Sequence, residues 1–168
     1  MENSTITNSE STIQVKYAGF WWRFLAHIID GFIIGAVSWI VYIPFLAIFG
    51  LSIYSMSEAG MEIEDNPAAV GTFMLGYFIM ISVTVGLQWL YYAIMESSKA
   101  QGTLGKMALR IKVTDYNGNR ISFGRASGRY FGKYISSLIL LIGYIMAGFT
   151  EKKQALHDIM AGCLVIKE

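Results

Sequence analysis

The sequence predicts an all-α membrane protein with two long transmembrane helices, a third short apolar helical segment and a small cytoplasmic β-hairpin. Three observations support this fold class. Of the 168 residues, 54% are hydrophobic and only 15% are charged, whereas soluble domains carry about 25% charged residues. Two apolar runs of 26 residues each are long enough to cross a bilayer. Basic residues concentrate after the second run, which is the pattern of a cytoplasmic loop.

The first apolar run contains a charge inside a predicted membrane span. The run covers residues 24–49 within a span over about 20–49, and its only charged residue is Asp30. Helical spacing places His27 and Arg23 on the same helix face as Asp30. Because a charge at this depth costs about 3 kcal/mol or more, we expect Asp30 to face protein or a hydrated cavity.

The second apolar run returns the chain to the cytoplasm. The segment before it, 50–67, has four acidic and no basic residues, so charge bias places that segment outside. The run itself, 70–95, has no charge, and Gln88 is its most polar member. Gln88 either forms a hydrogen bond to another helix or lines the same cavity as Asp30.

The remaining segments complete one membrane domain over 17–168. Residues 1–16 are predicted to form a disordered cytoplasmic tail, because they are polar and lack the features of a signal or transit peptide. The third apolar run, 134–149, has 16 uncharged residues and is short for a span. Basic residues flank both of its ends. The segment 131–149 is therefore either a re-entrant hairpin or a third complete span.

The loop 96–134 carries eight of the thirteen basic residues of the chain. This bias places the loop on the cytoplasmic side. Alternation in 110–114, turn chemistry in 115–119 and a second extended pattern in 120–123 predict a β-hairpin. The C-terminal segment 163–166 is a natural third strand beside it.

Within the same loop, glycines recur every four residues beside Arg125, Arg129 and Lys133. On a helix these residues form a basic stripe at the membrane surface. Anionic lipid headgroups are the expected partner, because each such cation is worth about 1 kcal/mol near an anionic leaflet. Nucleic-acid binding is not required by this pattern.

A polar cluster near the membrane boundary is the expected functional site. Its main members are Arg23, His27, Asp30 and Asp158, with Gln88 and His157 in support. With two histidines and one cysteine, the chain has no believable catalytic arrangement and no clustered metal ligands. We expect no enzyme activity, no metal and no cofactor.

Four motifs resemble the signatures of the bacterial RDD family. In chain order they are Tyr17–Arg23 followed by Asp30, then 101–106, 121–126 and 155–162. The family is named for one arginine and two aspartates, and the resemblance implies that these are Arg23, Asp30 and Asp158. It further implies a multi-pass protein of the bacterial inner membrane. Some members are associated with cation/proton exchange, and others occur beside partner membrane proteins.

Two functions remain open at this point. In the first, Asp30 carries a proton or small cation, which requires an oligomer because two spans and a hairpin cannot enclose a pathway. In the second, the polar cluster is structural, and the protein is a regulatory or structural partner of another membrane protein or of its own copies. In both, the N-terminus is cytoplasmic.

Overall fold

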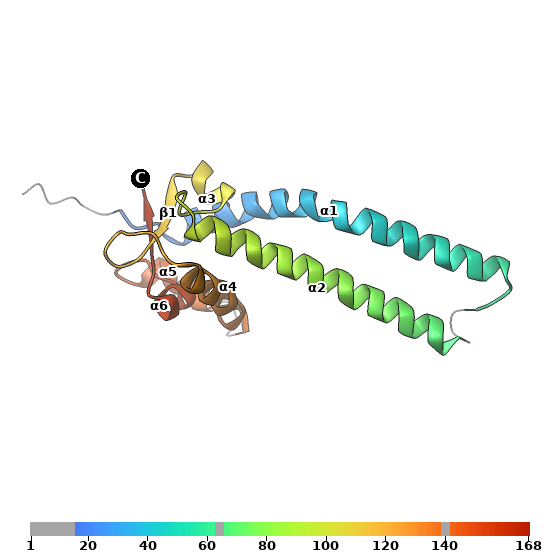
Figure 1. The fold of residues 1–168 in the computed structure, drawn as a ribbon. Coiled ribbons are helices and arrows are strands. Elements are labelled where there is room, and N and C mark those ends of the chain that lie inside the picture. Colours follow the sequence, from blue (N-terminus) through green and yellow to red (C-terminus); the bar gives the residue numbers. More distant parts are fainter. Residues whose placement is uncertain (1–15, 63–65, 139–141) are drawn as a thin grey trace, which may run out of the picture.

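The protein is a long pair of helices with a small folded cap at one end (Figure 1). The computed structural model describes residues 16–62, 66–138 and 142–168. The predicted disordered tail, apart from Lys16, lies outside these residues. Helices α1 (Phe20–Glu58) and α2 (Pro67–Ser97) are both long and apolar enough to cross a membrane. The prediction of two long apolar helices is confirmed.

Helix α1 extends nine residues beyond the predicted end of the first span. Its last turns are polar, but Ser52 and Ser55 satisfy their hydroxyls within the helix by donating to the carbonyls of Ile48 and Ser52. Serine in this arrangement is compatible with continued helix. The chain then reverses at Gly60, which has a φ of +65°, a left-handed conformation that glycine adopts without strain.

Helix α2 begins with a cap that the sequence encodes locally. The Asn66 side chain accepts a hydrogen bond from the backbone N–H of Ala69 at 3.1 Å, and Pro67 occupies the first turn. Both residues are typical of helix starts. Farther along, Phe73 of α2 packs against Phe49 of α1, with ring centroids 4.5 Å apart. These contacts hold the two helices together away from the cap.

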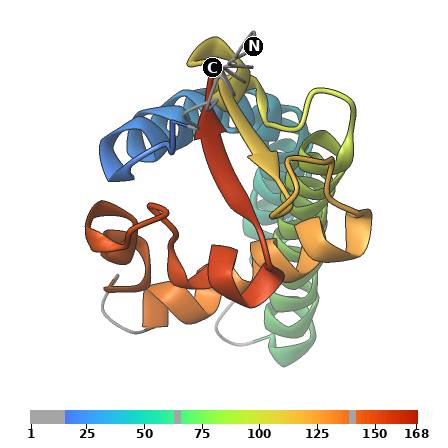
Figure 2. The ribbon, with the colours of Figure 1, turned by 90° about the vertical axis from the view of Figure 1, so that its left-hand side faces the viewer.

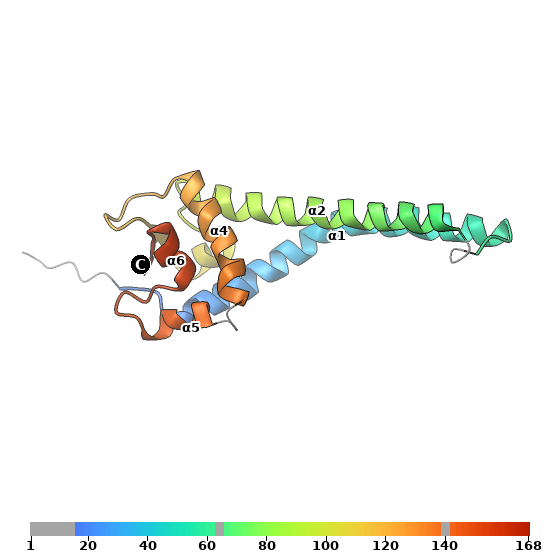
Figure 3. The same cartoon turned by 90° about the horizontal axis from the view of Figure 1, so that it is seen from below.

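The cap contains all the other helices and strands among the described residues. They are α3 (Leu104–Ala108), β1 (Ile111–Thr114), α4 (Phe123–Leu138), α5 (Ile142–Phe149), α6 (Leu156–Ala161) and β2 (Leu164–Lys167). Helix α4 packs on α2 and α5 packs on α1 (Figure 3). The small buried core combines cap residues, which include Val113, Ala126 and Val165, with Ala26 of α1 and Ala93 of α2 at the ends of the long helices that meet the cap.

The cap sheet joins distant parts of the chain. Strands β1 and β2 are antiparallel, with Ile111 opposite Lys167 and Thr114 opposite Leu164. The N-terminal segment also meets β2, because the N–H of Ala18 donates to the carbonyl of Val165 at 2.9 Å. Figure 2 shows the sheet crossing the end of the molecule, with α1 on one side and α4 to α6 on the other. The prediction that the C-terminal segment joins the sheet is confirmed.

The predicted β-hairpin between 110–114 and 120–123 needs a correction. Its turn is present, but the second arm contributes one isolated bridge, between Thr114 and Arg120. The chain then enters α4, where the Ser122 hydroxyl accepts from the N–H of Arg125 at 3.3 Å. The helix start takes up Ser122 and Phe123 at the end of the second arm, and the strand that pairs along β1 is β2.

The third apolar segment, 131–149, is not one straight helix. It is divided between α4 and α5, whose axes differ by 102°. Gly143 allows α5 to pack back on α4, because a Cβ atom there would lie 2.7 Å from the Cβ of Ser136. The residues between the two helices, 139–141, lie outside the described part of the chain.

Candidate functional site

Five charged side chains form a continuous series of ion pairs at the junction of the cap and the long helices. Arg129 Nε lies 2.6 Å from Asp158 Oδ1, and Arg129 Nη1 lies 2.8 Å from Glu96 Oε2. Lys106 Nζ pairs with the other Glu96 oxygen at 2.5 Å. Arg23 Nη1 pairs with the other Asp158 oxygen. We call these five residues the ion-pair chain.

Each member of the ion-pair chain comes from a different helix. Arg23 is on α1, Glu96 on α2, Lys106 on α3, Arg129 on α4 and Asp158 on α6. The ion-pair chain therefore connects both long helices to three cap helices at once. Removal of one charge would affect the position of several elements.

Burial makes these ion pairs structurally important. The side chains of Asp158, Glu96 and Arg129 are 0%, 1% and 2% exposed. A buried charge without a partner is strongly unfavourable, and breaking such a pair by removing one side costs about 3–5 kcal/mol. Positive and negative groups alternate along the ion-pair chain, so that Glu96 and Asp158 each have two cationic partners.

Burial and neighbouring charges shift the pKa values of three buried cap residues, Asp158, Lys106 and His157. Burial by itself raises the pKa of Asp158, but Arg129 and Arg23 outweigh burial and hold that pKa well below its usual range. Burial and the nearby Arg129 lower the pKa of Lys106, against the opposing effect of Glu96. The neighbouring His157 is buried, and burial lowers its pKa to about 3. Asp158 is therefore ionised and His157 neutral at pH 7.

Asp30 forms a second, separate polar contact that connects α1 to α2 and to the start of α3. Its Oδ1 accepts from the Tyr91 hydroxyl at 2.9 Å and from the N–H of Gly105 at 2.8 Å, while Oδ2 accepts from Thr103 Oγ1 at 2.5 Å. A Cβ atom at Gly105 would collide with the carbonyl of Ala26. Glycine is thus required for the close approach that supplies the backbone donor.

The structure separates some residues that the sequence groups together. Arg23 and Asp30 share a helix face but bridge poorly at a spacing of seven residues, which leaves pairing of Arg23 with Asp158 as the other prediction, and the structure shows that pair. His27 has an exposed side chain, and its Nδ1 lies 3.3 Å from the Tyr92 hydroxyl. Side chains from one face of α1 therefore contact two parts of the cap. Arg23 pairs with Asp158 of α6, and Asp30 accepts hydrogen bonds from Thr103 and Gly105 at the start of α3.

The supporting residues hold cap helices in place. Gln88 Oε1 accepts from the Tyr130 hydroxyl at 3.4 Å, which links α2 to α4. His157 Nδ1 lies 3.2 Å from Ser136 Oγ, which links α6 to α4. The interpretation of Gln88 as a helix–helix hydrogen-bonding residue agrees with this contact.

The basic stripe on α4 is divided between different environments. Arg125 is exposed, whereas Arg129 is buried in the ion-pair chain and has no free surface for lipid. Lys133 lies over the ring of Tyr92, with Nζ 4.0 Å from the ring centroid. The regular spacing therefore does not produce one continuous lipid-facing surface.

Glu96 and Lys106 are site residues that the sequence interpretation misses. Glu96 follows an uncharged apolar run directly, so it resembles an ordinary loop charge. Its position at the membrane boundary is the available signal, because a carboxylate there must be solvated or paired. Lys106 lies in the 101–106 motif, but its partner cannot be identified without the fold.

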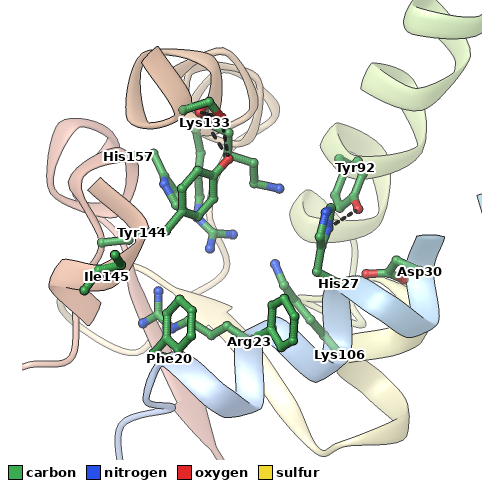
Figure 4. Close-up of a pocket in the computed structure, with 14 residues that line it drawn as sticks. Phe20, Arg23, His27, Asp30, Tyr92, Lys106, Lys133, Tyr144, Ile145 and His157 are labelled. Carbon is green, nitrogen blue, oxygen red and sulfur yellow. Dashed lines mark hydrogen bonds between the residues drawn. The ribbon is translucent and has the colours of Figure 1, made fainter. Parts of the chain in front are cut away.

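A cavity of about 390 Å³ lies beside the ion-pair chain, between the start of α1 and helices α4 and α5. Figure 4 shows Arg23, His27, Lys106, Lys133 and Asp30 around this space. Among the described residues, no group of three or more His, Cys, Asp or Glu side chains could hold a metal ion. Four of the side chains that line the cavity are those of Lys or Arg.

The buried His157 predicts a pH dependence of stability. Unfolded histidine titrates near pH 6.5, whereas folded His157 has a pKa of about 3. The stability that neutral His157 contributes is therefore complete above about pH 6.5 and is lost as pH falls from there toward 3, by at most about 1.4 kcal/mol per unit. The unfolding temperature in detergent should fall less between pH 7 and 5 in His157→Asn, which keeps the bond to Ser136, than in the wild type.

The control is Ser136→Ala, which removes the hydroxyl beside His157 Nδ1 but keeps the titratable imidazole, and so should retain the wild-type decline between pH 7 and 5. An identical decline in the wild type and His157→Asn would contradict the assignment.

Comparison with known proteins agrees with the motifs and the fold. Residues 17–162 match the RDD family. A Bacillus subtilis (strain 168) protein named "Uncharacterized protein YxaI" is 38% identical over 151 residues, which cover 90% of this chain and 97% of that protein. "Uncharacterized membrane protein YteJ" of the same strain is 28% identical over 154 residues, covering 90% and 82%. No solved structure matches the chain. The family match and the extent of these similarities show that the chain belongs to the RDD family.

Proposed function

We propose that this protein is a multi-pass protein of the bacterial inner membrane that acts as a structural or regulatory subunit, with its polar residues maintaining the fold. One observation carries this proposal. Glu96 and Asp158 each lie between two cations, and Asp30 accepts three hydrogen bonds. An ion or proton that bound these carboxylates would have to displace their existing partners. The displaced buried cations or donors would then lack a partner, which is energetically unfavourable.

In the proposed orientation the N-terminus and the cap are cytoplasmic. The cap carries most of the basic residues, and the segment between the long helices carries acidic ones, which agrees with the positive-inside rule. The sheet supports a re-entrant α4–α5 segment, because β1 and β2 flank that segment and pair with each other. A complete third span would require β1 and β2 to lie on opposite sides of the membrane.

The second candidate function is proton-coupled transport of a small cation by an oligomer. The observation that favours it is the position of Asp30 and His27 at the cavity. Against it, two long helices do not enclose a pathway on their own, and the cavity is lined by four Lys and Arg side chains. These cations would repel a cation, so we favour the structural role. We propose no enzyme activity.

The variant Asp30→Asn separates the two functions. Replacing one carboxylate oxygen with an NH2 group places a donor against the Tyr91, Thr103 or Gly105 donors, which should lower the unfolding temperature by an amount equivalent to about 1–3 kcal/mol. Under the structural proposal, vesicles containing the wild type show no pH-driven cation flux above that of protein-free vesicles. Fluorescence flux assays and thermal unfolding should be measured on the same preparations.

The matched control is Glu58→Gln, at the opposite end of α1. Wild-type flux that is lost in a fully stable Asp30→Asn protein would establish transport and overturn the structural proposal.

The role as a subunit predicts an assembly surface on α1. A Cβ atom added at Gly31 or Gly35 would meet nothing within 4 Å, so a second helix from another copy or a partner could approach there. The double variant Gly31→Leu/Gly35→Leu should reduce the cross-linked oligomer fraction in membranes while the unfolding temperature of the monomer stays unchanged. Gly50→Leu, also in open space on α1, is the control. Equal cross-linking in all three proteins would contradict this surface.

A further inference from the structure

The cavity beside the ion-pair chain has an excess of positive charge. Four cationic side chains line it: Arg23, Lys106, Arg129 and Lys133. Three of them belong to the ion-pair chain and share the carboxylates of Glu96 and Asp158. Asp30 is the only acidic residue in the lining. With Lys133 in its ammonium form, which an anionic ligand beside this buried amine would favour, these four cations and three carboxylates leave one positive charge without a counterpart.

Lys133 is the cation in this set that has no carboxylate partner among the described residues. Its Nζ instead lies 4.0 Å from the centre of the Tyr92 ring, a contact that does not neutralise its charge. In Figure 4 the amino group of Lys133 points from α4 toward the cavity, and that of Lys106 points toward it from below. Two amino groups and the Arg23 guanidinium therefore line one cavity, in which Asp30 supplies the carboxylate.

One part of the cavity wall is apolar and exposed at its rim. Phe20 and Phe24 of α1 and Ile145 of α5 line it, and Phe24 and Ile145 are 46% and 44% exposed. The lining residues of the cavity come from the start of α1 and from the cap, and the cap lies at one end of the two long apolar helices (Figure 1). A ligand that fits this arrangement has a negatively charged head beside the Lys and Arg side chains and an apolar portion against the exposed rim.

We propose that this cavity binds the headgroup phosphate of an anionic phospholipid, with Lys133 as its principal contact and the acyl chains along Phe24 and Ile145. A phosphodiester carries one negative charge, which matches the uncompensated positive charge of the cavity. Its oxygens accept charge-assisted hydrogen bonds from amino and guanidinium groups. The proposal rests on the membrane placement proposed above and extends it to one specific lipid site.

The site differs from the basic stripe predicted on α4. Arg125 lies outside the cavity lining, and Arg129 is committed to two carboxylates. A nonspecific electrostatic surface would weaken equally with the loss of any exposed cation. A built site would instead depend on Lys133 and be insensitive to Arg125.

The experiment uses the full-length protein purified in dodecyl maltoside and freed of lipid. Dioleoyl-phosphatidylglycerol or dioleoyl-phosphatidylcholine is titrated in, and bound lipid is counted by native mass spectrometry. The wild type should retain one phosphatidylglycerol in preference to phosphatidylcholine. Lys133→Gln should bind phosphatidylglycerol about tenfold more weakly, as expected for the loss of one charge-assisted contact. Arg125→Gln should bind like the wild type.

Lys133→Gln breaks no ion pair among the described residues, so its unfolding temperature without lipid should match the wild type. Equal lipid binding by Lys133→Gln and the wild type would overturn the proposal, as would an equal loss in Lys133→Gln and Arg125→Gln. Stabilisation of the wild type by inorganic phosphate, with no retained phosphatidylglycerol, would also overturn it in favour of a soluble anion. None of these outcomes depends on the Asp30→Asn result, so failure of the lipid site is distinguishable from failure of the proposed function.

Discussion

The structure depends on the position of one buried guanidinium, that of Arg129. It lies between Asp158 and Glu96, which come from α6 and α2. In an apolar environment near the membrane, an arginine stays ionised and must be neutralised by neighbours. The two carboxylates do this, and each then holds a further cation, Arg23 or Lys106. Compensation of one charge therefore connects five helices, although no large hydrophobic core is present in the cap.

This arrangement explains how the two long apolar helices can hold a folded cap at one end. Two apolar helices in lipid gain little from hydrophobic contact with each other, because lipid chains solvate their side chains as well. The small sheet gathers the N-terminal segment, β1 and β2 at one end. Asp30 fixes the loop before α3 to α1, and the ion-pair chain fixes α4 and α6. The cationic cavity is the space that this polar framework leaves between α1 and the α4–α5 pair.

The sequence predicts the long helices and the importance of Asp30 because each depends on a local constraint, whereas the importance of Arg23 and Asp158 is implied by the resemblance to the RDD family. Length and hydropathy identify the helices, and a charge inside an apolar run must be compensated, which identifies Asp30. The partner of each charge depends on the tertiary fold. Glu96 resembles a loop residue, and the regular spacing of Arg125, Arg129 and Lys133 does not reveal that one is buried, one exposed and one at a cavity. The turn at 115–119 is also predicted locally, but the partner of β1 lies at the C-terminus.

Hydrogen exchange of the Asp158→Asn variant in micelles tests the central claim most directly. Loss of this charge leaves Arg23 and Arg129 without a shared carboxylate, so local opening of the cap should become easier by about 3–5 kcal/mol. Amide exchange should accelerate in α4, α6 and β2 and remain unchanged in the middle of α2. Glu168→Gln, which removes the exposed pair with Lys112 at 2.6 Å, should have almost no effect. Unchanged exchange in α4 and α6 of Asp158→Asn would contradict the account.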